Sequence, residues 1–446
     1  MKKFSVLLTL AVLMVSSSVF AGSIDYLGNQ SAKYLISLAG SNARTDAADI
    51  VAYNPAGTAL MGEGFFIDVS NQTLFKPYSQ DMKIDGSFND SSEQSTPTLL
   101  LPNVYAVYNA GQIGVGKLAG YAQIGVTAGG GTLEWGNGAA ALLAKFQTNA
   151  LITSVDKIDT KVIGSSVYYD FGAGAAYSFL DDMVSVSAGA KYIIAKRSAE
   201  FDGELDVTSI IGAVTIDLDV AYDYDAAGYT PVFGIDVKPM KELTIGLRYE
   251  METDLKFEYD VTRTKTTNSL DLGLINDTVN DEYAAYDGEK FNQNLPQIVG
   301  IGAEYVVNPE LTVSAGAQIY FIGDADMEGA EDNYGTGWEA SIGAIYKVME
   351  PLKVGASFLY TAQAAKSELL EDEANIAVSA NPVLDSLFFG IGGIYTVIPN
   401  LDVTLALGWV HYLPEDAEIE LSNGDTLEVT YEKDIYNIAI GASYKI

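Results

Sequence analysis

The chain of 446 residues contains no cysteine, so no disulfide bond can hold the fold together. Its only histidine is His411, beside Trp409 and Tyr412 on a predicted strand. We interpret His411 as part of an aromatic belt at the membrane interface and not as a catalytic base. A serine hydrolase needs a general base, and this chain has neither a suitable histidine nor the Gly-x-Ser-x-Gly motif of such enzymes. A zinc site needs clustered His or Cys side chains, which the sequence also lacks. The sequence therefore predicts no catalytic residue, no metal site and no cofactor, and makes an outer-membrane hydrolase the least favoured alternative.

Basic residues are scarce. Lys and Arg number 25 against 59 Asp and Glu, which gives a formal net charge of −34. Phosphate binding needs the opposite sign of charge, so nucleic acid is excluded as a partner. The acids fall mainly in predicted loops such as Glu371-Asp372-Glu373, where water solvates them.

Long apolar runs are missing after the N-terminus. Lys2-Lys3, the apolar stretch from Phe4 to Val15 and the small-residue site ending at Ala21 are typical of a signal peptide over residues 1–21. No later segment approaches the roughly 20 apolar residues that a spanning helix requires. Any membrane crossing must therefore use strands, and export predicts the outer membrane of a Gram-negative cell.

The sequence instead contains a repeated short turn. Each copy places a Pro- or Asn-containing break between two strands of alternating polarity, and each following strand runs to a much longer acidic loop. The copies are Val237–Ile245, Tyr305–Val313, Tyr346–Val354 and Tyr395–Val403. Short turns at one end and long loops at the other are typical of a closed antiparallel barrel in an outer membrane.

Alternating side chains define about fourteen strands, an even number as single-chain bacterial barrels require. We predict an all-β fold in which residues 64–446 form a transmembrane barrel. The predicted strands are 64–76, 98–109, 117–128, 164–178, 183–200, 226–237, 242–258, 294–306, 311–323, 335–348, 353–364, 385–397, 402–413 and 434–446. The segments between them, including 79–97, 129–163, 201–225, 259–293 and 414–433, are predicted as turns and outer loops.

Residues 22–63 precede the first strand and contain two short Ala-rich segments with helical spacing. Thr45 or Asp46 is placed to cap the second segment. Asn54-Pro55-Ala56 then ends it, because Pro55 fixes φ and Asn54 is driven into an extended conformation, from which its amide can reach the wall. So small a segment cannot fold alone, and we expect it to plug the lumen as a hatch.

The stretch from Asn29 to Ala32 and the stretch from Asp46 to Leu60, with its Asn54-Pro55-Ala56 element, resemble the N-terminal hatch of the long-chain fatty-acid outer-membrane transporters, a family that includes the toluene-uptake porins. The resemblance covers nearly the whole mature chain. It implies a fourteen-strand barrel with a small hatch, an internal pocket for hydrophobic ligands, and an exit through the wall beside a kinked early strand. Asn54, Pro55 and Ala56 are the predicted gate.

Glycines in the third strand, at Gly120, Gly125 and Gly129, permit a bulge or kink, and there we place the wall opening. The alternative is that these glycines leave room for the hatch.

The ligand site is expected among apolar groups of the mature N-terminus, Ile24, Tyr26 and Leu27, together with Lys191 and Arg248, which parity turns into the lumen. Two positions depart from the family, because Glu200 and Glu250 stand where basic residues are typical. Lys191 and Arg248 are therefore expected to pair first with luminal acids such as Glu250 or Glu304.

The predicted function is uptake of hydrophobic small molecules, long-chain fatty acids or related lipids above all. The alternatives are a general diffusion porin and a structural or adhesive surface barrel. The expected partners are the hydrophobic ligand and outer-membrane lipid, and the protein is expected to be a monomer.

Overall fold

The computed structural model describes residues 31–84, 88–136, 152–209, 212–270, 280–281, 284–371, 381–421 and 424–446. The predicted signal peptide and the predicted ligand-site residues Ile24, Tyr26 and Leu27 lie outside these ranges. In the described part of the chain, no helix combines the length and the apolar character that crossing a membrane would take.

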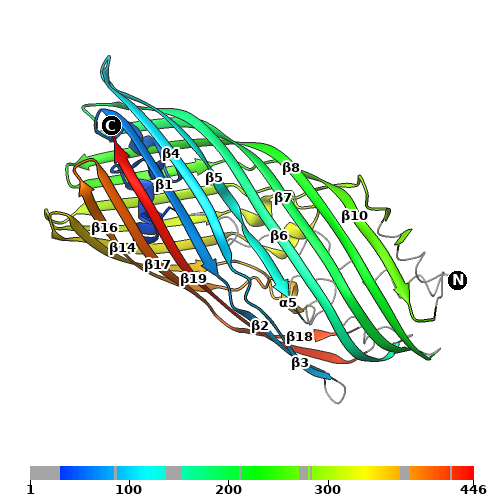
Figure 1. Ribbon diagram of the computed structural model, residues 1–446. Coiled ribbons are helices and arrows are strands. Elements are labelled where there is room, and N and C mark those ends of the chain that lie inside the picture. Colours follow the sequence, from blue (N-terminus) through cyan, green and yellow to red (C-terminus); the bar gives the residue numbers. More distant parts are fainter. Residues whose placement is uncertain are drawn as a thin grey trace.

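The described chain forms a closed antiparallel barrel of 14 strands, which confirms the predicted fold class (Figure 1). Closure comes from the pairing of the first strand with the last, in which Phe66 lies opposite Lys445 and Phe75 opposite Tyr436. In order, the barrel strands are β1 (Gly64–Phe75), β4 (Thr98–Ile113), β5 (Gly116–Trp135), β6 (Ile152–Phe179), β7 (Val184–Ser209), β8 (Gly212–Met240), β9 (Leu243–Glu250), β12 (Ile298–Val306), β13 (Leu311–Tyr320), β14 (Gly337–Met349), β15 (Leu352–Ala362), β16 (Ser386–Ile398), β17 (Leu401–Tyr412) and β19 (Thr426–Lys445).

Side chains alternate between the lumen and the outer surface along each wall strand, as β17 shows. Thr404 and Ala406 are buried inside, whereas Leu405 and Leu407 are 50% and 47% exposed on the outside. Leucines half exposed on the outer face are favourable in hydrocarbon and unfavourable in water. The outer surface of the wall is therefore a lipid-facing surface.

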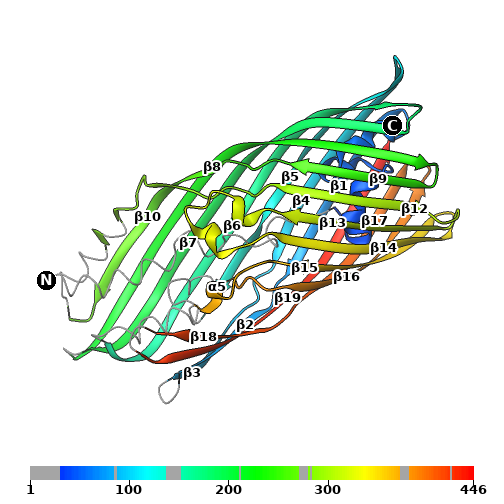
Figure 2. The same cartoon turned by 180° about the vertical axis from the view of Figure 1, so that it is seen from behind.

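Several strands extend well beyond the predicted boundaries. β5 to β8 run through much of the predicted loops 129–163 and 201–225, and β10 (Lys256–Asn268) pairs with β8 beyond the end of β9 (Figures 1 and 2). The prediction of loops was wrong here because the acids on one face of these strands masked the apolar residues on the other. Leu205, Val207, Leu218 and Val220 are buried in one cluster.

Shorter strands extend the barrel at the same end. Three of them, β2 (Tyr78–Ile84), β3 (Phe88–Gln94) and β18 (Glu415–Glu420), flank the outer part of β19 in a small sheet. A further short strand, β11 (Lys290–Asn292), pairs with β10. Short helices between the strands include α5 (Glu368–Glu371) and the single-turn 3-10 helices η7 (Ile322–Asp324) and η8 (Ala330–Asn333).

Residues 31–63, here called the luminal segment, lie inside the barrel near the C-terminal end of the chain (Figures 1 and 2). They form α2 (Tyr34–Ser37) and the 3-10 helices η4 (Leu38–Ala43), η5 (Ala48–Ala52) and η6 (Pro55–Leu60). On one side η4 contacts β12, β13 and β14, and on the other η6 contacts β5 to β8. The predicted cap was wrong, since Ala47 precedes η5 without a side-chain bond and Asp46 instead accepts hydrogen bonds from Arg44.

Candidate functional site

Asn54 joins the luminal segment to the barrel wall. It has the extended backbone that a following proline imposes, with φ −148° and ψ 97°. Its amide nitrogen donates to the carbonyl of Asn42 at 2.8 Å, to that of Ile235 on β8 at 3.2 Å and to the carboxylate of Asp236 at 2.9 Å. Because one bond stays within the luminal segment and two reach β8, Asn54 fixes the segment's position on the wall.

Pro55 and Ala56 complete this attachment. Pro55 occupies the first position of η6, where its missing N–H costs nothing. The carbonyl of Ala56 accepts a short hydrogen bond from the hydroxyl of Ser185 on β7. At the other end of η6, Asn109 of β4 donates to the carbonyl oxygens of Thr58 and Met61, each at 3.0 Å. Both ends of η6 are therefore tied to the wall.

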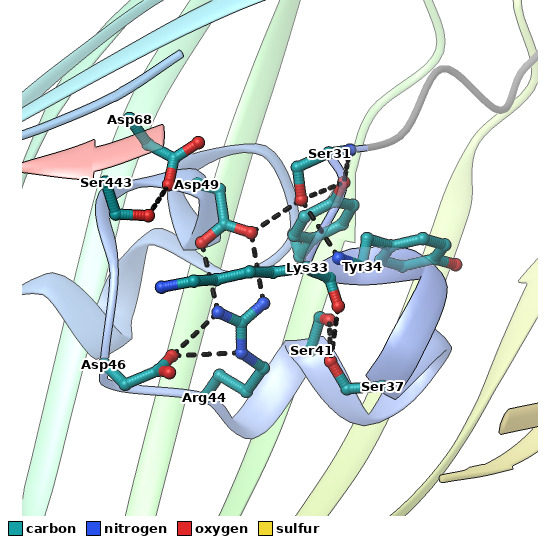
Figure 3. A network of polar contacts seen from close by, with 11 residues as sticks. Ser31, Lys33, Tyr34, Ser37, Ser41, Arg44, Asp46, Asp49, Asp68 and Ser443 are labelled. Atoms are coloured by element: carbon teal, nitrogen blue, oxygen red, sulfur yellow. Dashed lines mark hydrogen bonds and ion pairs between the residues drawn. The ribbon is translucent and has the colours of Figure 1, made fainter. Parts of the chain in front are cut away.

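An ion network makes the luminal segment rigid (Figure 3). The guanidinium of Arg44 donates to both carboxylate oxygens of Asp49, at 3.1 and 3.2 Å, and to Asp46 at 2.7 Å. Arg44 and Asp49 are fully buried, and Asp49 also accepts from the hydroxyl of Ser31 at 2.6 Å. Removing one partner of such a bidentate buried pair strongly destabilises the fold, because the other charge is left buried without a counter-charge.

An internal cavity of about 70 Å³ lies beside the luminal segment. Tyr34 and Tyr53 of the segment line it, and their rings stack with centroids 4.4 Å apart. Sites for drug-sized ligands measure roughly 300–1,000 Å³. A long-chain molecule can therefore occupy this cavity only if the groups around it move.

Lys191 and Arg248, two predicted ligand residues, both line this cavity and meet at Glu250. Lys191 donates to the two oxygens of Glu250 at 2.8 and 2.9 Å, and Arg248 makes a shorter contact with the same carboxylate. All three side chains are less than a tenth exposed. The predicted pairing with a luminal acid is therefore present, and the Nε of Arg248 has no hydrogen-bond partner.

Two further acids line the same cavity. Asp170 accepts a short hydrogen bond from Gln123, and Glu339 accepts from Gln318 at 3.1 Å and from the hydroxyl of Tyr320 at 2.9 Å. With Glu250, three carboxylates thus face two basic groups. An incoming carboxylate would add a fourth acid to this cavity, whereas an uncharged molecule would disturb none of these pairs.

The third barrel strand, β5, leaves the regular wall beside this cavity. Its register against β6 shifts between Val126 and Ala128 and again between Ala128 and Gly131. Gly129 and Gly131 have φ of +97° and +73°, a backbone region that favours glycine. From Val126 to Trp135 buried residues alternate with half-buried ones, and residues 126–128 line the cavity. This part of β5 is therefore buried on one face and partly exposed on the other.

A seam in the wall follows from this path. Among the described residues, β4 pairs with β5 only as far as Asn103 opposite Gly125, although β4 continues to Thr98 in its pairing with β1. Residues 98–102 and 126–135 thus face each other without a backbone ladder, and we call this gap the wall seam. Its side-chain contacts include a hydrogen bond of 2.8 Å from the hydroxyl of Thr98 to the carbonyl of Gly130.

The three predicted wall glycines have different surroundings. Gly129 lies in the bulge, whereas Gly125 gives room to the side chain of Asn103 and not to the luminal segment. Gly120 is exposed, with open space where a Cβ would stand. Their role in a wall opening stays a prediction, as do the roles of Asn54, Pro55 and Ala56 in gating and of Lys191 and Arg248 in ligand binding.

Several luminal groups were not predicted. The acids Asp170 and Glu339 and the aromatic rings of Tyr34 and Tyr53 come together only through the three-dimensional fold. Parity alone places Glu250 beside Arg248, two residues apart on one face. Within the described residues, no group of three or more His, Cys, Asp or Glu side chains has a metal-binding arrangement.

Comparison with known proteins gives the family. Residues 12–446 match the family model described as outer membrane protein transport protein (OMPP1/FadL/TodX). The fold is similar to a FadL homologue of Pseudomonas aeruginosa, with a TM-score of 0.65 and 14% identity over 95% of this chain and 99% of that one. The toluene transporter TbuX of Ralstonia pickettii (TM-score 0.57, 15% identity) and TodX of P. putida (0.59, 14%) are similar over the same shares of each chain. No curated protein matches the sequence.

Proposed function

Because the chain belongs to the outer membrane protein transport family (OMPP1/FadL/TodX), we propose that it carries small hydrophobic molecules across the Gram-negative outer membrane in which its barrel lies. Family and fold are those of transport channels. The observation that carries the proposal is the meeting of three features at one place: a luminal segment tied to the wall, a cavity beside it, and a wall seam next to that cavity.

The luminal segment acts as the hatch, and residues 22–63 with the barrel of residues 64–446 form the two working parts. The 70 Å³ cavity holds no long ligand as it stands, so a passing molecule has to displace Tyr34 and Tyr53 or the wall beside them. Asn54 is placed to resist that displacement, since two of its hydrogen bonds fix the hatch on β8 and the third joins it to Asn42 within the hatch.

The route that this arrangement supports runs from the outer loops to the cavity and then sideways through the wall seam. Val126 to Ala128 separate the cavity from the seam, and their bulged backbone can shift without breaking a β4–β5 ladder. A hydrophobic molecule that leaves between strands enters lipid directly. It thereby avoids the aqueous exit that would cost about 0.8 kcal/mol per exposed methylene.

Among hydrophobic molecules, the charges of the cavity favour uncharged ones over fatty acids. Lys191 and Arg248 already share Glu250, so a fatty-acid carboxylate would have to compete for them against a buried acid. Two of the similar solved structures are described as toluene transporters. The fatty-acid substrate expected from the sequence stays a prediction that the same experiment tests.

The test is uptake into proteoliposomes of three solutes of similar size: an uncharged arene, a medium-chain fatty acid and a hydrophilic sugar. We expect the arene to enter faster than in protein-free vesicles, the acid more slowly than the arene, and the sugar at the background rate. Equal entry of the sugar would contradict the proposal and favour a general diffusion porin. If neither hydrophobic solute entered faster than in protein-free vesicles, the result would contradict the proposal and favour a structural barrel.

A further inference from the structure

Lys76 lies at the wall seam, in the link between β1 and β2. Its side chain is 2% exposed. Its ammonium group donates to the carbonyl oxygens of Gly130 at 2.7 Å and of Thr132 at 2.8 Å, both on the bulged part of β5. Since β1 pairs with β4 up to Leu74 opposite Thr98, Lys76 reaches across the end of β4 to the strand beyond it.

These two carbonyls lie on the part of β5 that has no backbone ladder with β4. One ammonium group reaches both carbonyls, and the hydroxyl of Thr98 on β4 reaches that of Gly130, so both carbonyls face the β4 side of the strand. A regular β4 would offer backbone N–H groups there. The ammonium of Lys76 takes the place of those donors, and Thr98 adds its hydroxyl to the same carbonyl of Gly130.

The charge on Lys76 is held by neutral groups. None of the ion pairs of the described residues includes Lys76, and Lys433 on β19, another cation, is close enough to act on it electrostatically. Lys433 lies over the rings of Tyr412 and Tyr78, at 4.2 and 5.1 Å from their centroids. A buried ammonium that is satisfied by carbonyls alone forms a contact that is easier to release than a buried ion pair, because no opposite charge is left behind.

We propose that Lys76 is a removable closure of the wall seam, which holds β5 against the end of β4 through the Gly130 and Thr132 carbonyls and releases it when a molecule passes. This inference rests on the proposed function, because it assigns a specific residue to the opening and closing of the proposed exit.

The test is hydrogen–deuterium exchange of the full chain in lipid nanodiscs, read on the peptide covering residues 126–135. Lys76→Met keeps the length of the side chain and removes its donors. Exchange in this peptide is expected to rise about tenfold, which corresponds to about 1.4 kcal/mol, while peptides of β14 and β15 stay unchanged. Lys83→Met is the matched control, since Lys83 lies on the adjoining strand β2 with its side chain 51% exposed.

Thr98→Val supplies a second, milder variant in case Lys76→Met does not assemble. It removes only the hydroxyl that donates to the carbonyl of Gly130. Amide exchange in residues 126–135 should therefore rise less than in Lys76→Met. Unchanged exchange in both variants, or acceleration spread evenly over the barrel, would overturn the proposal. Amide exchange is measured without a transported substrate, so this test is independent of the uptake assay. A protein that carries no hydrophobic solute can still show the closure by Lys76, and a working transporter can still lack it.

Discussion

Gly246 on β9 offers the sharpest perturbation of the attachment between the hatch and the wall. It lies opposite Asp236, and the space where its Cβ would stand is filled by the carbonyl of Asn42 and the carboxylate of Asp236. Both of these groups accept hydrogen bonds from Asn54. Gly246→Ala therefore drives apart the two acceptors that hold Asn54, without changing Asn54 itself.

The expected size of the effect follows from these contacts. A real Cβ does not approach another heavy atom within 3.0 Å, so the Asn42 carbonyl would have to retreat by roughly 1 Å. Losing one neutral and one charge-assisted hydrogen bond weakens the attachment by about 3 kcal/mol. Because each 1.4 kcal/mol is a factor of ten, the detached state of the hatch should become about a hundred times more populated.

Single-channel recording in planar bilayers measures this population directly. We expect brief openings to be about a hundredfold more frequent in Gly246→Ala, with the folded barrel retained as judged by heat-modifiable gel mobility. Gly120→Ala is the control, because a Cβ there meets nothing within 4 Å. If Gly246→Ala opened as rarely as wild type and the control, Asn54 would not be the tie that holds the hatch.

Three further predictions concern the charges and the gate. Glu250→Gln should strengthen binding of a fatty acid relative to an uncharged arene, as measured by calorimetry, because Lys191 and Arg248 lose their acid; a reversed preference would show that these cations do not face the ligand. Arg44→Met should destabilise the hatch by about 3–5 kcal/mol and speed amide exchange in residues 31–60 more than in the barrel strands. Lys83→Met, which breaks an exposed ion pair, is the control and should have almost no effect. Asn54→Ala combined with Pro55→Ala should leave the barrel assembled but change arene uptake, and unchanged uptake would remove these residues from the gate.

The barrel could be predicted because alternation is a local signal. Leu405 and Leu407 point outward and Thr404 and Ala406 inward, and no tertiary information is needed to see the pattern. The lengths of β7 and β8 could not be predicted in the same way. Asp202, Asp217 and Asp219 made these segments look like solvated loops, although Leu205 and Leu218 between them are buried.

The site was predictable only where one strand or one short motif carries it. Proline chemistry indicated the extended Asn54 and its reach to the wall. The meeting of Lys191 with Glu250 depends on the register of three strands, since Lys191 lies opposite Thr230 and Glu250 opposite Val232, and one sequence does not contain that register. Lys76 was missed although parity places it on the same face as Ser70 and Gln72, because the partners of its side chain on β5 depend on the fold.

A reversible cross-link through the wall seam tests the central claim most directly. A Cβ on Gly131 would lie 3.1 Å from the Cβ of Thr98, close to the roughly 3.5–4.5 Å that a disulfide needs. Cysteine at Gly131 also has to bear the left-handed φ of +73°, so assembly of the reduced double variant is checked first by heat-modifiable gel mobility. Because the natural chain has no cysteine, the double variant Thr98→Cys, Gly131→Cys can form a single intramolecular disulfide. We predict that arene uptake by proteoliposomes stops when this bond is oxidised and returns on reduction. Uptake at the same rate in the oxidised and reduced protein would contradict passage through the seam.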